Sequence, residues 1–154
     1  MSAEARLTEL GITLPPAPKP GGVYKPLVRI GNLAYLSGHG PSKDGVSYQT
    51  GRVGADLSLE EGRASARQVG LNLLATLKQE LGSLDQVVRV IKTLALVNCT
   101  DDFTRQPEVI NGFSELFAEV FGPDAGVGAR SALAANTLPG NIPVEIEIIV
   151  EVKS

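Results

Sequence analysis

The stretch GVGARSALAANTLPGNIPVEIEIIVEV, residues 126–152, decides how this 154-residue chain is interpreted. It predicts two strands, and alternation separates the second strand into an apolar face and a more polar face. The apolar face holds Val144, Ile146, Ile148 and Val150, and the other face holds Glu145, Glu147, Ile149 and Glu151. In the first strand Arg130 shares a face with Ala132 and Ala134, whose small side chains leave open space beside it.

Two interpretations fit an arginine and carboxylates on such strands. They could form a solvated strand face with a surface ion pair, which contributes about 0–1 kcal/mol. Alternatively, Arg130 binds an anion and a glutamate beside it acts as a base, in a pocket where subunits meet. A guanidinium binds a carboxylate through two parallel hydrogen bonds, a stronger contact than a neutral hydrogen bond. The spacing alone fits both interpretations.

Composition excludes several classes of protein. The length suits one domain, and no apolar run reaches the roughly 18 residues of a transmembrane helix. The N-terminus lacks the order of a secretory signal, so we expect a cytoplasmic protein with no membrane partner. A net charge of −3 and 5% aromatic residues argue against nucleic-acid binding. One cysteine and one histidine exclude an internal disulfide and the usual zinc clusters, and we expect no metal.

The order of predicted elements is β-β-(β)-α-β-α-β-β, after a short N-terminal helix and a proline-rich arm. Ser58 and Glu61 form a capping box that opens a long amphipathic helix, which Gly82 closes. Gly31-Asn32 predicts a hairpin turn. The remaining expected elements are a helix at 3–11, an arm at 12–22, strands within 23–30, 33–38 and 86–98, and a helix at 108–122.

Two main helices cannot cover both faces of a five- or six-stranded sheet, so we predict a two-layer α+β fold with both helices on one face. Residues 86–98 are apolar on both faces, which is typical of a strand buried on both sides. Strict alternation places Val88, Val90, Leu94 and Leu96 on one side and Val87, Ile91 and Val97 on the other. An apolar sheet face left without helices predicts a homo-oligomer whose sheets face one another.

Other candidate residues carry weaker signals. Gly126-Val-Gly128 is similar to part of a phosphate loop, but a strand follows it, so a flexible loop is favoured. His39 fits a general base or a polar surface residue in a turn. Cys99 has no histidine near it in sequence, which favours a buried structural cysteine.

Three ordered motifs resemble the RidA/YjgF family, the reactive intermediate deaminases, also named L-PSP endoribonucleases. ARSALAANTLPGNIPVEIEIIVEV resembles the family's C-terminal signature, A-R-S-x-V followed by L-P and V-E-I-E. VYKPLVRIGNLAYLSGHGP resembles its segment with Tyr and S-G-Q-x-P, and VINGFSELFAEVFG resembles V-N-x-x-Y-x-x-F-F. The similarity covers roughly residues 22–153, so we assign 1–21 to an N-terminal helix and arm and 22–154 to a RidA-like domain.

The resemblance implies a chorismate-mutase-like fold and a homotrimer in which the sheets line an inner barrel and three pockets lie at the subunit interfaces. It also implies that the last strand lies beside the first rather than in a hairpin with its predecessor. Carried over by motif, Arg130 binds the substrate carboxylate and Glu145 positions or activates water. Tyr24, Ser37 and Asn111 line the pocket.

This sequence departs from the family pattern at three of the aligned positions. Ala132 stands where the family often has cysteine, His39 replaces a glutamine and comes near the expected pocket rim, and Ser114 stands where an aromatic residue is common. We include Ala132 and His39 among the residues expected to contact substrate. These departures indicate a distinct subgroup with a different pocket.

The resemblance implies hydrolytic deamination of a small enamine or imine that carries a carboxylate, with release of a keto acid and ammonia. The activity would be of the 2-iminobutanoate/2-iminopropanoate deaminase type, and it needs no cofactor because an iminium is already electrophilic. Two alternatives remain open. The chain could be a non-enzymatic trimer that binds a small carboxylate metabolite and regulates a partner, or an endoribonuclease, which the acidic composition disfavours.

Overall fold

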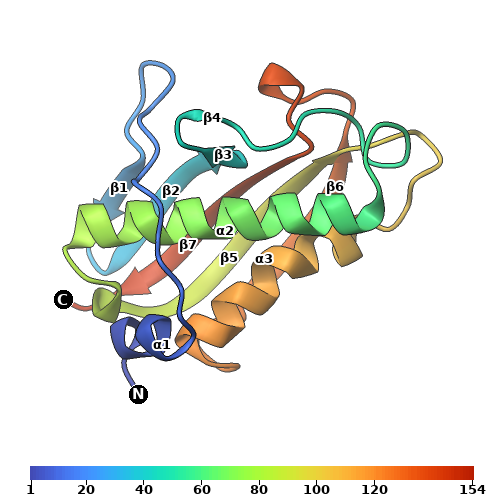
Figure 1. The fold of residues 1–154 in the computed structure, drawn as a ribbon. Helices are drawn as coiled ribbons and strands as arrows, with labels where there is room; N and C mark the ends of the chain where they lie inside the picture. Colours follow the sequence, from blue (N-terminus) through green and yellow to red (C-terminus); the bar gives the residue numbers. More distant parts are fainter.

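The computed structural model describes residues 1–154 as two layers, with helices packed on one face of a five-stranded sheet (Figure 1). The strands lie in the order β1-β2-β7-β5-β6, and only β5 and β6 are parallel neighbours. This confirms the predicted α+β class with a mixed sheet. The sheet consists of β1 (Leu27–Ile30), β2 (Leu33–His39), β5 (Val87–Asn98), β6 (Ala129–Ala135) and β7 (Val144–Val152).

Two long helices cover one sheet face, as predicted (Figure 1). The helix α2 (Leu59–Leu81) begins at the expected capping box and ends at Gly82, which adopts the left-handed conformation. The helix α3 (Gln106–Phe121) begins two residues before the expected start, because a proline fits the first turn of a helix. No helix is both long and apolar enough to span a bilayer. The shorter elements are α1 (Ala3–Glu9), the 3₁₀ turns η1 (Leu84–Gln86) and η2 (Pro139–Asn141), and a separate hairpin of β3 (Ser42–Lys43) and β4 (Val46–Ser47).

The hydrophobic core lies between the helices and the sheet and contains 26 buried residues. The two helices approach most closely where glycines remove the Cβ atom. At Gly112 of α3, an added Cβ would lie 2.2 Å from the backbone oxygen of Arg63 on α2. Burial at this crossing fixes α3 along the sheet, and α3 in turn carries residues of the candidate site.

The last strand, β7, lies between β2 and β5. It forms no hairpin with β6, which confirms half of the prediction. The expectation that it lies beside the first strand is wrong, because β1 is the outer strand of a hairpin and only β2 has a free edge on the inner side. The predicted Gly31-Asn32 turn closes that hairpin, with Gly31 at φ +57°.

Strict alternation along β5 is wrong at two positions. The pairing of β5 with β7 shifts between Val87 and Arg89 and again between Val90 and Lys92. Each shift adds a residue to one strand and so exchanges the faces that follow it. Val90 is therefore buried under the helices, and Ile91 is 37% exposed. Leu94 and Leu96 share the side that faces away from the helices, so their placement on one side is confirmed.

The sheet face opposite the helices carries many apolar side chains next to Glu145 and Glu147, and it has no cover within one chain. Large apolar side chains on it are solvent-exposed, so within one chain β5 is buried on one side only, and the predicted burial of its other side depends on association. The exposed members include Val28, Ile30, Tyr35 and Leu133, at 44–67% exposure. Exposed apolar surface of this extent on neighbouring strands is typical of an association surface.

The N-terminal segment packs against the domain. α1 lies beside one end of α3, where the Arg6 side chain donates to the Glu119 carbonyl at 2.9 Å. Glu4 accepts from the Leu84 backbone N–H at 3.0 Å and pairs with Lys78 at 2.7 Å. The proline-rich residues that follow run in an extended conformation past α2 towards β1 (Figure 1).

Candidate functional site

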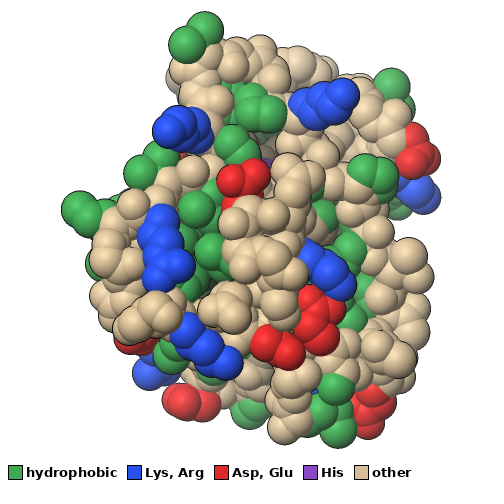
Figure 2. All heavy atoms as spheres, turned by 90° about the vertical axis from the view of Figure 1, so that its left-hand side faces the viewer, with side chains coloured by type: hydrophobic (Ala, Val, Ile, Leu, Met, Phe, Trp, Pro, Cys, Tyr) green, Lys and Arg blue, Asp and Glu red, His purple; other side chains and the backbone are tan.

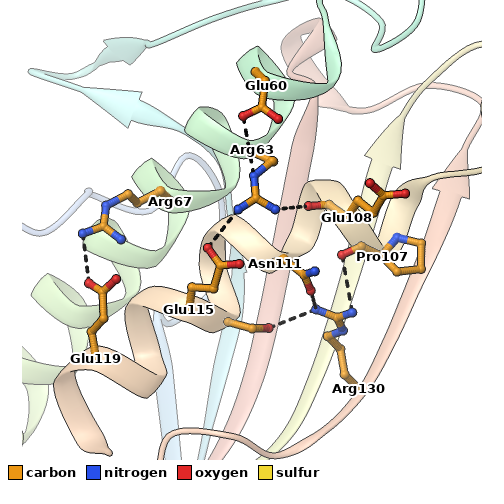
Figure 3. Close-up of polar contacts among 10 residues, drawn as sticks. Glu60, Arg63, Arg67, Pro107, Glu108, Asn111, Glu115, Glu119 and Arg130 are labelled. Carbon is orange, nitrogen blue, oxygen red and sulfur yellow. Dashed lines mark hydrogen bonds and ion pairs between the residues drawn. The ribbon is translucent and has the colours of Figure 1, made fainter. Parts of the chain in front are cut away.

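Arg130 extends from β6 towards the first half of α3, where neutral oxygen atoms hold its guanidinium (Figure 3). Its Nη1 donates to Asn111 Oδ1 at 2.9 Å and to Ser114 Oγ at 3.1 Å. Its Nη2 donates to the Pro107 carbonyl at 3.4 Å. Arg130 and Asn111, both expected in the pocket, are thus joined by a direct hydrogen bond.

No carboxylate lies within ion-pair distance of Arg130. The guanidinium has five N–H donors, and three are used by the contacts above, so two remain free. Partial burial lowers the pKa of Arg130, but an arginine stays charged in proteins. The group is therefore an oriented cation without a counter-ion, which favours binding of an anion.

The local sequence explains this arrangement. Asn111 and Ser114 are three residues apart on α3 and so share one helix face. Arg130 pairs with Thr93 across β5 and β6 and lies on the helix-covered side of the sheet. Ion pairs from Arg63 to Glu115 at 2.9 Å and from Arg67 to Glu119 at 3.2 Å join α2 to α3 (Figure 3). The acceptors of Arg130 thus lie on an anchored helix.

Glu145 lies on the open face of the sheet, beside Gly38. An added Cβ at Gly38 would lie 3.0 Å from Glu145 Cδ, so the missing side chain provides the space that the carboxyl group occupies. Burial, and then the negative charge of Glu147, raise the pKa of Glu145. A carboxylate that holds a proton more readily than usual is suited to proton transfer near neutral pH.

Ser37 precedes Gly38 on β2, and Tyr24 borders a hollow together with Gly38. Ser37 Oγ donates to the Lys25 carbonyl at 2.6 Å and its N–H donates to the Pro26 carbonyl at 3.0 Å, which joins the loop before β1 to β2. The Tyr24 hydroxyl accepts from the Gly21 N–H at 3.1 Å, and the side chain is 50% exposed. Neither residue lies in the Arg130 cluster.

His39 and Ala132 lie on the helix-covered side of the sheet. The His39 ring is buried, with Nδ1 2.6 Å from the Ser37 carbonyl and Nε2 2.8 Å from Thr76 Oγ1 on α2. Burial lowers the pKa of the His39 ring and so favours its neutral form. Ala132 is partly buried against the core. The pairing of β2 with β7 shifts register between Leu36 and His39. The contact of the imidazole with Thr76 holds this irregular segment against α2.

One chain brings the predicted residues together in two groups. Arg130 pairs with Thr93, whose side chain is buried beneath the helices, whereas Glu145 pairs with Leu96, which faces the opposite side. The first group contains Arg130 and Asn111, and the second contains Glu145, Ser37 and Tyr24. A site that uses both groups needs a second copy of the chain.

Sequence reasoning missed several contacts of the site. Ser114 was noted only as a departure from a family pattern, yet it accepts directly from Arg130. The Pro107 carbonyl is a backbone group, which no residue pattern marks. Gly38 could have been noticed as a glycine inside a strand, which often marks a bulge or a close approach. No three His, Cys, Asp or Glu side chains are grouped so that they could hold a metal ion.

Comparison with known proteins agrees with this architecture. Residues 4–152 match the family described as YjgF/chorismate mutase-like, a description that also carries the word endoribonuclease. The chain is 39% identical to Protein TCP17 of Trypanosoma cruzi over 150 residues, which covers 97% of this chain and 94% of that protein. It is 30% identical to a 2-iminobutanoate/2-iminopropanoate deaminase of Dermatophagoides farinae, with 92% and 95% coverage.

A solved structure shows the same fold over nearly the whole chain. The protein Atu1372 of Agrobacterium tumefaciens, whose function is unknown, superposes with a TM-score of 0.90 at 41% identity, covering 98% of this chain and 92% of that one. The fold is therefore the YjgF/chorismate-mutase-like α+β fold. The chain belongs to the RidA/YjgF family, as the sequence motifs predicted.

Proposed function

We propose that this protein hydrolyses small enamines or imines that carry a carboxylate, releasing a 2-keto acid and ammonia. The observation that carries this proposal is the environment of Arg130: three neutral acceptors orient the guanidinium, and no acidic side chain neutralises it. A substrate carboxylate on the two free N–H groups would gain about 1.5–3 kcal/mol as a charge-assisted contact. The deaminase name of one relative gives the reaction class.

We further propose that the protein is a homotrimer in which the open sheet faces line an inner barrel. Its exposed apolar face supports association. The separation of the two residue groups supports a heterologous interface, in which one protomer supplies Arg130 and Asn111 and its neighbour supplies Glu145, Ser37 and Tyr24. Three such interfaces close a ring and give three equal sites.

The reaction follows from these positions. The enamine first tautomerises to the imine, whose carbon is electrophilic. Arg130 holds the carboxylate, while Glu145 takes a proton from water as the water oxygen bonds to the imine carbon. On the N-protonated imine, Glu145 then returns this proton to the nitrogen, which gives an ammonium leaving group on the hydroxyl-bearing carbon. Glu145 next takes the hydroxyl proton as the carbon–nitrogen bond breaks and the keto group forms, and the departing ammonia carries that proton away as ammonium. Orientation and electrostatics are the protein's main contributions.

The proposal is tested by generating 2-aminoacrylate in situ and following pyruvate release above the uncatalysed rate. Wild type should accelerate release, and Arg130→Ala should lose roughly 10- to 150-fold in kcat/KM, the equivalent of one charge-assisted contact. Arg29→Ala is the matched control, because it removes an exposed guanidinium that donates to the Gly31 and Lys153 carbonyls at the sheet edge opposite β6. Normal turnover by Arg130→Ala would refute the mechanism.

The same preparation distinguishes the other two functions. If wild type does not turn over any imino acid but binds a keto acid tightly, the protein is a metabolite-binding module. Salt-sensitive RNA cleavage that persists after rigorous purification would indicate a nuclease. On the face shown in Figure 2, acidic and basic side chains are interspersed rather than gathered into a basic patch, which does not favour RNA as the substrate.

A further inference from the structure

A hollow of about 260 Å³ lies beside Arg130, between α3 and the start of β6. Thr93, Asn111, Ser114 and Arg130 line its polar part. One wall is the loop at 126–128, which lies very close to its neighbours. An added Cβ would lie 2.2 Å from the Phe117 carbonyl oxygen at Gly126 and 2.8 Å from the Val90 oxygen at Gly128. The backbone thus closes the wall, and the glycines keep side chains out of it.

Thr93 is the unusual member of this lining. Its side chain is only 3% exposed, yet no hydrogen bond joins its hydroxyl to any other group of the chain, although the residue borders the hollow. The fully buried polar atoms without a partner are Arg52 Nε and Asn98 Oδ1, so the Thr93 hydroxyl is accessible from the hollow that the residue borders. A hydroxyl with no partner in the chain is free to bond a group that enters this space.

Two further donors border the same space. Asn111 uses its Oδ1 on Arg130, which leaves its Nδ2 amide hydrogens free. Ser114 accepts from Arg130 through Oγ and still has its own O–H to donate. No acidic residue borders the hollow. The hollow thus offers three unpaired hydrogen-bond donors and no negative charge. This combination suits a ligand group that has an acceptor oxygen.

We propose that this hollow binds the substituent of the substrate and that the preferred substrates are 2-imino acids whose substituent carries an acceptor oxygen, rather than a purely apolar chain. The inference rests on the proposed function. With the carboxylate on Arg130 and the imine carbon facing the neighbour's Glu145, the substituent is the part of the molecule left to occupy the hollow. Hydroxyl, amide and carboxylate groups share the required oxygen.

The test measures dissociation constants of 2-oxo acids, the products, by calorimetry. Two pairs have similar shapes: hydroxypyruvate against 2-oxobutanoate, and 2-oxoglutarate against 2-oxohexanoate. Wild type should bind at least one oxygen-bearing member about fivefold more tightly, the equivalent of one net hydrogen bond. The first pair tests a hydroxyl and the second a carboxylate.

Thr93→Val keeps the shape of the side chain and removes the hydroxyl, so it should abolish this preference and leave the binding of 2-oxobutanoate unchanged. Unchanged 2-oxobutanoate binding also shows that Thr93→Val folds. Thr8→Val is the matched control for Thr93→Val, since Thr8 is exposed on α1.

Each outcome decides between the proposals. Equal binding within both pairs overturns the substrate preference alone, and a preference that survives in Thr93→Val overturns its assignment to the Thr93 hydroxyl, provided that Arg130→Ala weakens binding of every oxo acid. If wild type binds none of them, or Arg130→Ala binds them equally well, the carboxylate site is wrong and the proposed function is overturned together with this inference.

Discussion

Arg130 and Glu145 lie on opposite faces of one sheet. Arg130 pairs with Thr93, whose side chain lies beneath the helices, and Glu145 pairs with Leu96 on the open face. Each residue also has an environment that does not fit a plain surface ion pair. The arginine is oriented but has no counter-ion, and burial raises the pKa of the glutamate. Their separation within one chain indicates that a shared site lies between chains.

The fall of kcat/KM on the acid side of the pH profile (the acid limb) should reflect protonation of the Glu145 carboxylate. Its pKa is raised first by burial and second by Glu147, so activity that needs the ionised carboxylate should fall as pH falls through a value above the ordinary 4.5. Glu147→Gln removes a negative charge and makes ionisation easier, so the limb should move to lower pH in kcat/KM profiles. Glu151→Gln, farther along the same face, should leave the limb in place. A limb that Glu147→Gln does not move would contradict the assignment to Glu145.

Gly38→Ala should displace the Glu145 carboxyl group. The new Cβ would lie 3.0 Å from Glu145 Cδ, closer than normal packing allows. Because Arg130 is untouched, we expect kcat to fall more than KM rises in steady-state kinetics. Gly21→Ala is the matched control, since an added Cβ there meets no atom within 4 Å. Equal losses in the two variants would rule out a local effect on Glu145.

Gly112→Ala should destabilise the fold through the crossing of α2 and α3. The added Cβ would meet the Arg63 backbone oxygen at 2.2 Å, and a backbone atom cannot rotate away. Overpacking of this kind costs about 1–3 kcal/mol, which urea unfolding followed by circular dichroism can measure. Activity per folded molecule should also fall, because α3 holds two acceptors of Arg130. A free energy of unfolding equal to that of wild type would show that the crossing is looser than described.

Local features of the fold could be predicted because their causes lie within a few residues. The capping box at Ser58, the αL cap at Gly82 and the Gly31-Asn32 turn each depend on neighbouring side chains or on one glycine. The position of β7 and the two register shifts in β5 could not be predicted by alternation. They depend on which strand edge is free and on where the ladder takes up an extra residue.

In the candidate site, too, the features with local causes could be predicted and those that depend on the assembled fold could not. Arg130 stood out as a cation among small residues, but its spacing fitted a surface ion pair equally well, and only the motifs pointed to Asn111. The three-residue step from Asn111 to Ser114 could have identified the second acceptor, because both face the same way on a helix. Thr93 had no such signal. Its importance comes from a hydroxyl left without a partner at a particular place in space.

A site shared between protomers is the central feature of the proposed mechanism, and a complementation experiment tests it directly. Arg130→Ala and Glu145→Gln chains carrying different affinity tags are co-expressed, and mixed oligomers are isolated by tandem purification. In a ring of three, one interface combines an intact Arg130 with an intact Glu145, so mixed oligomers should show about one third of wild-type deaminase activity. Each variant alone should be nearly inactive. Mixed trimers, verified by native mass spectrometry, that are no more active than the single variants would contradict the shared site.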